Sequence, residues 1–254
     1  MSSENVSSNP LSDLGLPAPL VLGSGSFTRK LILKEMGIPF ILKVRPIDER
    51  NIGDRSDGSN PSKLVMKLAK AKSEALISAL LDPSITNGNP NKESNEEKYD
   101  MTLPPELKEC IILTGDQVVT CQDSILEKPE NLTQAKEFVA KYGTIPPSTV
   151  GSVVLTHLPS KISVSDVDIS TIHFKSSLSE ADNASDLIDR LLEKDEPILS
   201  CAGGLMVEHP FVIEYIDKID GSQDGVMGLS KDLVMRLLNE LKVEVDAWKS
   251  KSTD

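Results

Sequence analysis

A turn of small residues near the N-terminus has the composition of an anion-binding site. Residues 23–26, Gly-Ser-Gly-Ser, follow an apolar segment over residues 19–23 and precede a predicted helix over residues 28–36. Small side chains let backbone N–H groups approach a phosphate, and a helix N-terminus adds positive potential. Arg29 follows one turn later. Because Thr28 stands at the third position of a GxGxxG pattern and the P-loop pattern fails too, an ordinary strand-to-helix turn remains an alternative.

Two carboxylate positions could take part in metal or acid–base chemistry. Asp116 lies inside the apolar run IILTGDQVV, and a buried carboxylate is costly unless it is paired or bound to a metal. Asp48 and Glu49 follow a second predicted strand over residues 38–44. Since adjacent side chains point in different directions, at most one of this pair would face a site, and a solvated turn is the simpler interpretation.

The local sequence around two lysines and three histidines does not by itself indicate a functional site. Lys72 lies on a predicted helix and Lys128 precedes a proline in a loop, so both are surface residues by default. The histidines lack metal-ligand spacing, and the chain has no GxSxG nucleophile elbow.

Composition narrows the class of partner. The net charge of −12 disfavours binding to DNA or RNA, although a small phosphorylated ligand is possible where a few cations gather. Three cysteines without a CxxC pair favour a reducing compartment. No apolar run is long enough to span a membrane, and the N-terminus lacks a signal-peptide pattern. We therefore expect a cytoplasmic protein.

Strands alternate with helices, which predicts an α/β fold. We expect strands over residues 19–23, 38–44, 110–120, 149–158 and 169–178, and helices over residues 28–36, 61–81, 131–142, 185–195 and 231–250. Residues 1–18 are predicted to be a disordered tail. Residues 82–107, rich in Pro, Asn, Ser and Glu, are predicted to be an insertion loop, partly disordered.

The order of the motifs resembles that of the Maf family of nucleotide pyrophosphatases. The family pattern SxSPRR is similar to Ser24–Arg29, the DE pair to Asp48-Glu49, and LAxxKA to residues 68–73, with Ser73 in place of the last alanine. The remaining motifs follow in the same order: Asp116-Gln117-Val118, Lys128-Pro129, Cys201-Ala202-Gly203-Gly204, and Val226–Ser230 in place of VxGLP. The resemblance covers about residues 19–241.

This resemblance implies a fold, an activity and roles for residues. It implies a mixed, elongated, twisted sheet flanked by helices with a central cleft, as in Maf and inosine triphosphatase-like enzymes, over residues 19–245. It implies a homodimer that cuts nucleoside triphosphates into monophosphate and pyrophosphate with Mg²⁺, Mn²⁺ or Co²⁺. The metal or the attacking water would be held by Glu49 and Asp116, with Lys72 as a further catalytic group. The substrate would be bound by Ser24, Gly25, Ser26, Arg29, Lys128, Gln117 and Glu208.

Several positions differ from the family pattern and bear on the substrate. Phe27 and Thr28 replace Pro and the first Arg, and Ser200-Cys201 replaces the Asp-Lys of DKAG. A branch that acts on 7-methyl-GTP also has CAG, a DQV strand and a glutamate matched by Glu208. A carboxylate accepts from the guanine N1–H and amine pair, so Glu208 is our candidate for base recognition, with a solvated loop residue as the alternative. A UTP-, dTTP- or CTP-type pyrophosphatase, or a nucleotide-binding regulator of cell division with weak turnover, also remains open.

Overall fold

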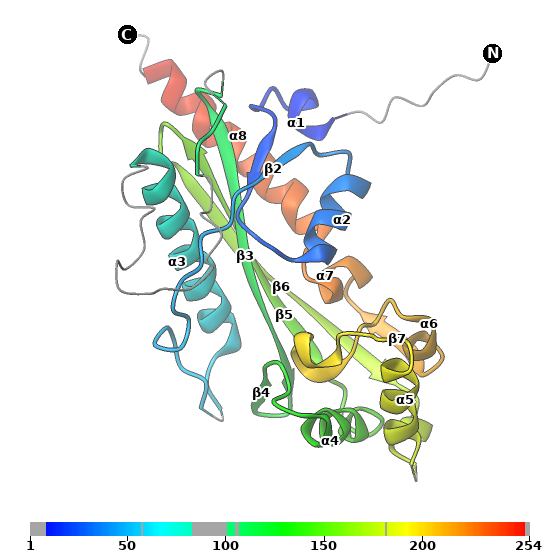
Figure 1. The fold of residues 1–254 in the computed structure, drawn as a ribbon. Coiled ribbons are helices and arrows are strands. Elements are labelled where there is room, and N and C mark those ends of the chain that lie inside the picture. The colour runs from blue at the N-terminus through cyan, green and yellow to red at the C-terminus, as the bar shows by residue number, and fades with distance from the viewer. Residues whose placement is uncertain (1–8, 57, 83–100, 105–106, 181, 252–254) are drawn as a thin grey trace, which may run out of the picture.

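A seven-stranded mixed sheet forms the centre of the molecule (Figure 1). The computed structural model describes residues 9–56, 58–82, 101–104, 107–180 and 182–251. The strand order is β2-β1-β3-β5-β6-β7, and β4 pairs with β3 off this path. Strands β2, β1 and β3 are parallel, whereas β3, β5, β6 and β7 are antiparallel neighbours. The predicted α/β class and its mixed sheet flanked by helices are confirmed.

The strands differ greatly in length. Three of them are long: β3 (Cys110–Cys121), β5 (Ser148–Leu158) and β6 (Ser163–Phe174). The others are short: β1 (Leu20–Leu22), β2 (Phe40–Leu42), β4 (Ser124–Leu126) and β7 (Ile216–Asp220). The sequence did not indicate β4 or β7, because three to five residues with charged or polar members carry little periodicity.

Two of the longer helices begin directly after an asparagine cap. The long helix α3 (Pro61–Leu81) has Asn60 as its cap and proline at its first position, and α4 (Leu132–Tyr142) is capped by Asn131. The remaining helices are α1 (Pro10–Asp13), α2 (Phe27–Glu35), α5 (Asn183–Leu192), α6 (Pro210–Ile213), α7 (Gln223–Met227) and α8 (Lys231–Lys251), with short 3₁₀ turns at Ser176–Ser179, Ile198–Ser200 and Ala202–Gly204.

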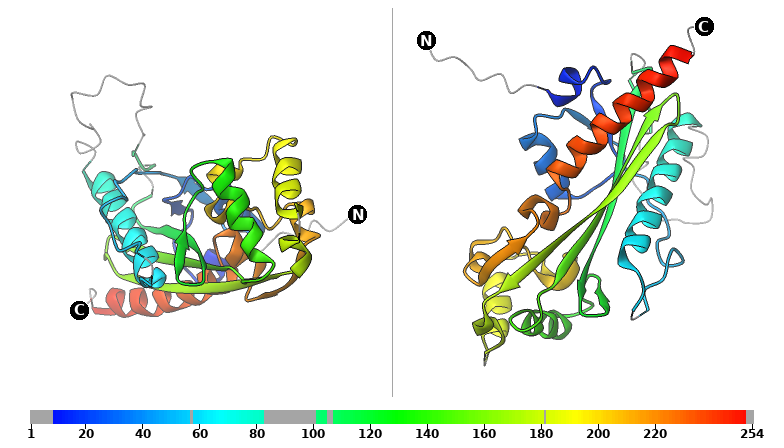
Figure 2. Two further views of the ribbon diagram at one scale, coloured as in Figure 1. Left: turned by 90° about the horizontal axis from the view of Figure 1, so that it is seen from below. Right: turned by 180° about the vertical axis from the view of Figure 1, so that it is seen from behind.

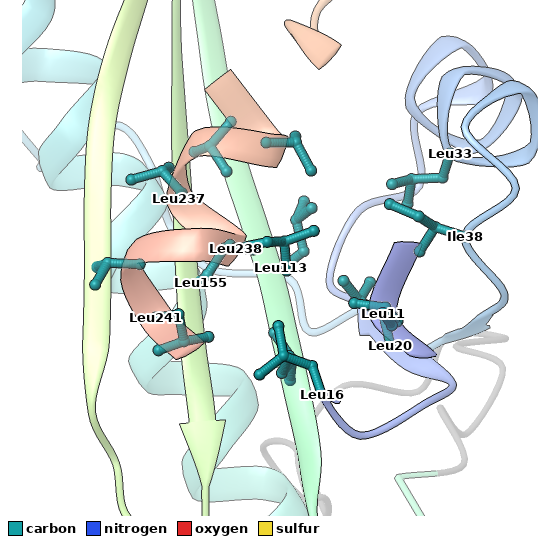
Figure 3. Close-up of a cluster of buried hydrophobic side chains, with 14 of the residues drawn as sticks. Leu11, Leu16, Leu20, Leu33, Ile38, Leu113, Leu155, Leu237, Leu238 and Leu241 are labelled. Carbon is teal, nitrogen blue, oxygen red and sulfur yellow. The ribbon is translucent and has the colours of Figure 1, made fainter. Parts of the chain in front are cut away.

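Helices α3 and α8 cover opposite faces of the sheet (Figure 2, left). Side chains of β3 alternate between these faces: Ile111 and Leu113 pack with α8 and α2, whereas Cys110 and Ile112 pack with α3. The largest buried cluster joins leucines of α8, β3, β5 and the N-terminal segment (Figure 3).

The predicted N-terminal tail is too long. Residues 10–13 form helix α1, and Leu11 and Leu16 are 0% and 7% exposed within the α8 core. Leu11 and Leu16, five residues apart, anchor this segment in the core, and Leu14 packs against the same cluster. Residues 1–8 lie outside the described residues.

Most of the predicted insertion loop, residues 83–100 and 105–106, also lies outside the described residues. Its C-terminal part does not behave as a surface loop, since Met101 is 3% exposed and packs in the α3 core. An apolar methionine at this position anchors the chain before β3.

Candidate active site

The middle of β3 lacks a neighbouring strand along one of its two edges. Strand β5 pairs with β3 from Cys110 to Thr120 along one edge. Along the other edge, β1 pairs with residues 112 and 113 and β4 pairs with residues 119–121. Within the described chain, residues 114–118 lie between these two short strands, with no strand beside them on this edge. Asp116 and Gln117 stand in the middle of this gap.

Asp116, Lys72 and Glu49 form one charged cluster at the gap. The Lys72 ammonium donates a short hydrogen bond to Asp116 Oδ1 and lies 3.0 Å from Glu49 Oε1. The side chain of Lys72 is 19% exposed, so this residue is not the surface lysine that its helix position suggested. Burial raises the pKa of Asp116 above its usual range, and the nearby charge of Lys72 only partly opposes this effect. Three residues far apart in sequence thus meet on the α3 side of β3.

Arg29 is buried at the same gap and ties three segments together. Its Nη1 donates to Gly115 O at 2.8 Å and to Ser24 Oγ at 3.1 Å, and its Nε donates to Gly228 O at 2.9 Å. Burial lowers the pKa of the Arg29 guanidinium, while the charges of Asp116 and Glu49 oppose that shift. The guanidinium remains charged. The residue therefore positions the 23–26 turn against β3 in addition to supplying positive charge near Asp116.

Gln117 reaches the opposite face of β3 from Asp116. Its Nε2 donates to Val226 O at 2.8 Å, at the end of α7. Gly228, which ends α7 with a φ of 115°, leaves no room for a Cβ beside Gln117 Oε1. Gln117 and Arg29 thus hold the 226–228 segment from two sides, a role that the sequence did not indicate.

A cavity of about 520 Å³ opens beside Gln117. Its lining includes Ser26 and the first residues of α2, together with much of the segment over residues 197–208. Lys128 and Glu208 supply its cationic and anionic side chains. The remaining lining is largely apolar or small: Phe27, Thr28, Val119, Tyr142, Pro147, Thr149, Ile172, Phe174, Pro197, Ser200, Cys201, Ala202, Gly203, Leu205, Met206, Val207, Val226 and Met227.

The floor of this cavity is fixed by aromatic packing. The rings of Tyr142 and Phe174 stack with centroids 5.7 Å apart, and Tyr142 Oη donates to Gly203 O at 2.7 Å. Gly203 has a φ of 71°, a conformation that favours glycine. Sequence reasoning missed Tyr142 and Phe174 as lining residues, because a buried aromatic residue gives the same pattern in any core.

The predicted site residues fall into two adjoining groups. Glu49, Lys72 and Asp116 form the charged cluster, while Ser26, Gln117, Lys128 and Glu208 line the cavity. Ser24 and Arg29 lie between these groups, because Arg29 contacts both Ser24 and the carbonyl that precedes Asp116. Gly25 is exposed, with open space around its Cα.

The charged cluster has the donor set for a divalent cation that also binds substrate. Among the described residues, no group of three or more His, Cys, Asp or Glu side chains could enclose a metal alone. Glu49 and Asp116 nevertheless converge on one ammonium group, which shows that both carboxylates can reach a common cation. Mg²⁺ is usually held by one or two carboxylates together with substrate phosphates, so these residues fit such an ion.

Comparison with known proteins decides the family. Residues 19–241 match the family described as Maf-like protein. The chain belongs to this family. It is 31% identical over 223 residues to the 7-methyl-GTP pyrophosphatase of Dictyostelium discoideum, covering 88% of this chain and 97% of that protein.

Bacterial relatives of this Maf-like protein are more distant. It is 27% identical over 230 residues to a nucleoside triphosphate pyrophosphatase of Corynebacterium aurimucosum, covering 90% of this chain and 97% of the relative. It is 25% identical over 232 residues to one from Synechococcus sp., covering 91% and 98% respectively. Within the described residues, no helix is long and apolar enough to cross a bilayer.

Proposed function

We propose that this Maf-like protein is a metal-dependent nucleoside triphosphate pyrophosphatase whose preferred substrate is 7-methyl-GTP. Family membership supports the reaction class, and the similarity to the Dictyostelium discoideum enzyme supports the substrate. The observation that carries the proposal is the Glu49–Lys72–Asp116 cluster, which adjoins a cavity walled by Glu208. Phosphoryl chemistry and base recognition would take place on the two sides of one strand.

The charged cluster would serve the phosphates. Glu49 and Asp116 would hold a divalent cation, which supplies charge neutralisation between the α- and β-phosphates. One of the two carboxylates would also orient the attacking water and take up its proton. Lys72 and Lys128 are mobile point charges suited to phosphate oxygens. The hydroxyls of Ser24 and Ser26, with the N–H groups at the start of α2, complete the proposed phosphate site.

The cavity would hold the base. Methylation at N7 gives guanine a positive charge, which suits a mainly apolar cavity whose anionic lining residue is Glu208. The carboxylate also accepts from the N1–H and exocyclic amine of the guanine ring. Glu208, Lys128 and Cys201 all line this one cavity.

A nucleotide panel with Mg²⁺, Mn²⁺ or Co²⁺, scored for pyrophosphate release, tests this proposal. We expect 7-methyl-GTP to have the highest kcat/KM, followed by GTP. Preference for UTP, dTTP or CTP would refute the substrate but leave the reaction class. Absence of release from every nucleotide would instead favour a nucleotide-binding regulator, consistent with Thr28 and Ser200-Cys201 replacing charged residues of the family pattern.

A further inference from the structure

Phe27 stands exposed at the entrance to the proposed nucleotide site. It is the first residue of α2, lines the cavity, and has 75% of its surface exposed. Among the described residues it is the only aromatic side chain of the exposed class. Single exposed apolar residues are common on proteins, but this one also lines the cavity of the proposed site.

The turn over residues 24–29 presents less positive charge than the family pattern SxSPRR would place there. Thr28 Oγ1 lies 2.9 Å from Ser26 Oγ, and Ser26 caps α2, so the Thr28 hydroxyl supports the turn. Arg29 is buried, with its Nε and Nη1 bonded to Gly228, Ser24 and Gly115. The entrance therefore presents an aromatic ring and hydroxyl groups, where the SxSPRR pattern would place a further guanidinium.

An exposed aromatic ring with few cationic groups beside it fits a substrate that has a second base and carries less phosphate charge than a nucleoside triphosphate. In a nucleoside triphosphate, the terminal phosphate is joined to the rest of the molecule through a single anhydride oxygen and approaches a double negative charge at neutral pH. In a dinucleoside 5′,5′-triphosphate every phosphate is esterified or bridged on both sides and carries a single charge. The second nucleobase also supplies a flat surface, and bases stack on exposed aromatic side chains irrespective of their identity.

We propose that the protein also cleaves dinucleoside 5′,5′-triphosphates in which one base is 7-methylguanine, with Phe27 stacking on the other base. The inference rests on the proposed function, since the methylated nucleotide occupies the cavity of Glu208. Water attacks the phosphorus adjacent to the methylated nucleoside, and the bond from that phosphorus to the bridging oxygen breaks. The products are 7-methylguanosine 5′-monophosphate and a nucleoside diphosphate, which takes the place of pyrophosphate as leaving group. The proton of the water passes to a carboxylate of the charged cluster and then to solvent.

The test compares 7-methyl-GTP with 7-methylguanosine(5′)triphospho(5′)guanosine as substrates of the full chain, with products resolved by chromatography. Variants are Phe27→Ala, Phe27→Trp and, as a control, Val243→Ala, another strongly exposed apolar residue (67%) on α8. We expect wild type to cleave both compounds. Phe27→Ala should lower kcat/KM for the dinucleotide ~5- to 150-fold, the range that one base–aromatic stack contributes. The same variant should lower kcat/KM for 7-methyl-GTP by a smaller factor, because that substrate has no second base to stack on the ring. Phe27→Trp should retain dinucleotide cleavage, and Val243→Ala should change neither activity.

Each contrary result has a distinct meaning. Cleavage of 7-methyl-GTP without cleavage of the dinucleotide overturns the inference and leaves the proposed function standing. Equal losses on both substrates in Phe27→Ala overturn the stacking role, and sedimentation of that variant shows whether the ring instead contacts a second copy of the chain. If folded wild type cleaves neither compound, the proposed function and the inference fail together.

Discussion

Replacing Asp116 by asparagine separates the chemistry of the charged cluster from its contribution to stability. Asn has nearly the shape of Asp, so packing against α3 is preserved while the charge is removed. The Lys72 ammonium does not lose its last partner, because Glu49 Oε1 remains 3.0 Å away. The variant thus avoids an unpaired buried charge, which would cost ~3–5 kcal/mol.

The expected magnitudes differ sharply for activity and stability. Removal of a group that holds the cation or accepts the proton should lower kcat at least ~100-fold. Stability should stay the same or rise, because burial disfavours the charged form of Asp116 more than Lys72 favours it. A gain of up to ~1 kcal/mol would raise Tm by about 2–4 °C for a chain of this size.

The assay measures pyrophosphate release at saturating 7-methyl-GTP alongside thermal unfolding without nucleotide or metal. Asp220→Asn is the matched control, since Asp220 pairs with Lys218 and His173 on β6 and β7, away from the cavity and the charged cluster. Normal turnover by Asp116→Asn would show that the carboxylate is not catalytic. A fall in Tm of several degrees would show that Asp116 is chiefly structural and that the assessment of its burial is wrong.

Three other predictions concern the cavity, the cysteines and assembly. Glu208→Gln should lower kcat/KM for 7-methyl-GTP by roughly 10- to 150-fold, the value of a charge-assisted hydrogen bond, and spare UTP; a uniform effect across nucleotides contradicts base recognition. Burial raises the pKa of Cys110 and Cys201 to about 11, above the ~8.5 of a free thiol. These thiols therefore stay protonated to a higher pH in the folded chain than in the unfolded chain. The free energy of unfolding should then fall as pH rises above ~8.5. In addition, iodoacetamide at pH 8 should label native protein far more slowly than urea-unfolded protein. Rapid native labelling would refute this. We also expect a homodimer, and sedimentation equilibrium that finds only the 27.6 kDa chain at every concentration would exclude it.

The sequence predicted the elements better than it predicted their contacts. Asp116 was identifiable because a carboxylate inside an apolar strand needs a partner, and the structure supplies Lys72. Lys72 itself could not be identified from periodicity, since a lysine on an amphipathic helix looks the same whether it faces water or a carboxylate. Glu49 was equally ambiguous in a polar loop. Only the order of family motifs connected these three residues before the fold placed them together.

Positioning contacts were still harder to infer. Arg29 and Gly228 are 199 residues apart, and Gln117 and Val226 are 109 apart. In both contacts the acceptor is a backbone carbonyl, which every residue possesses, so no side-chain pattern at the acceptor could reveal them. The hydrogen bond from Tyr142 Oη to Gly203 O beside the cavity is of the same kind, with a backbone carbonyl as the acceptor.

The gap beside β3 explains how two kinds of chemistry can share one short stretch of strand. Successive side chains of a strand point to opposite faces, so Asp116 meets α3 while Gln117 meets α7. Inside a fully paired sheet these faces would be separated by neighbouring backbone. Here β1 and β4 are only three residues long and leave residues 114–118 without a neighbouring strand on that edge. A nucleotide lying across this open edge could place its phosphates by Asp116 and its base beside Gln117. If the proposed site is correct, the shortness of β1 and β4 serves function, because extending either strand along β3 would place backbone between the charged cluster and the cavity.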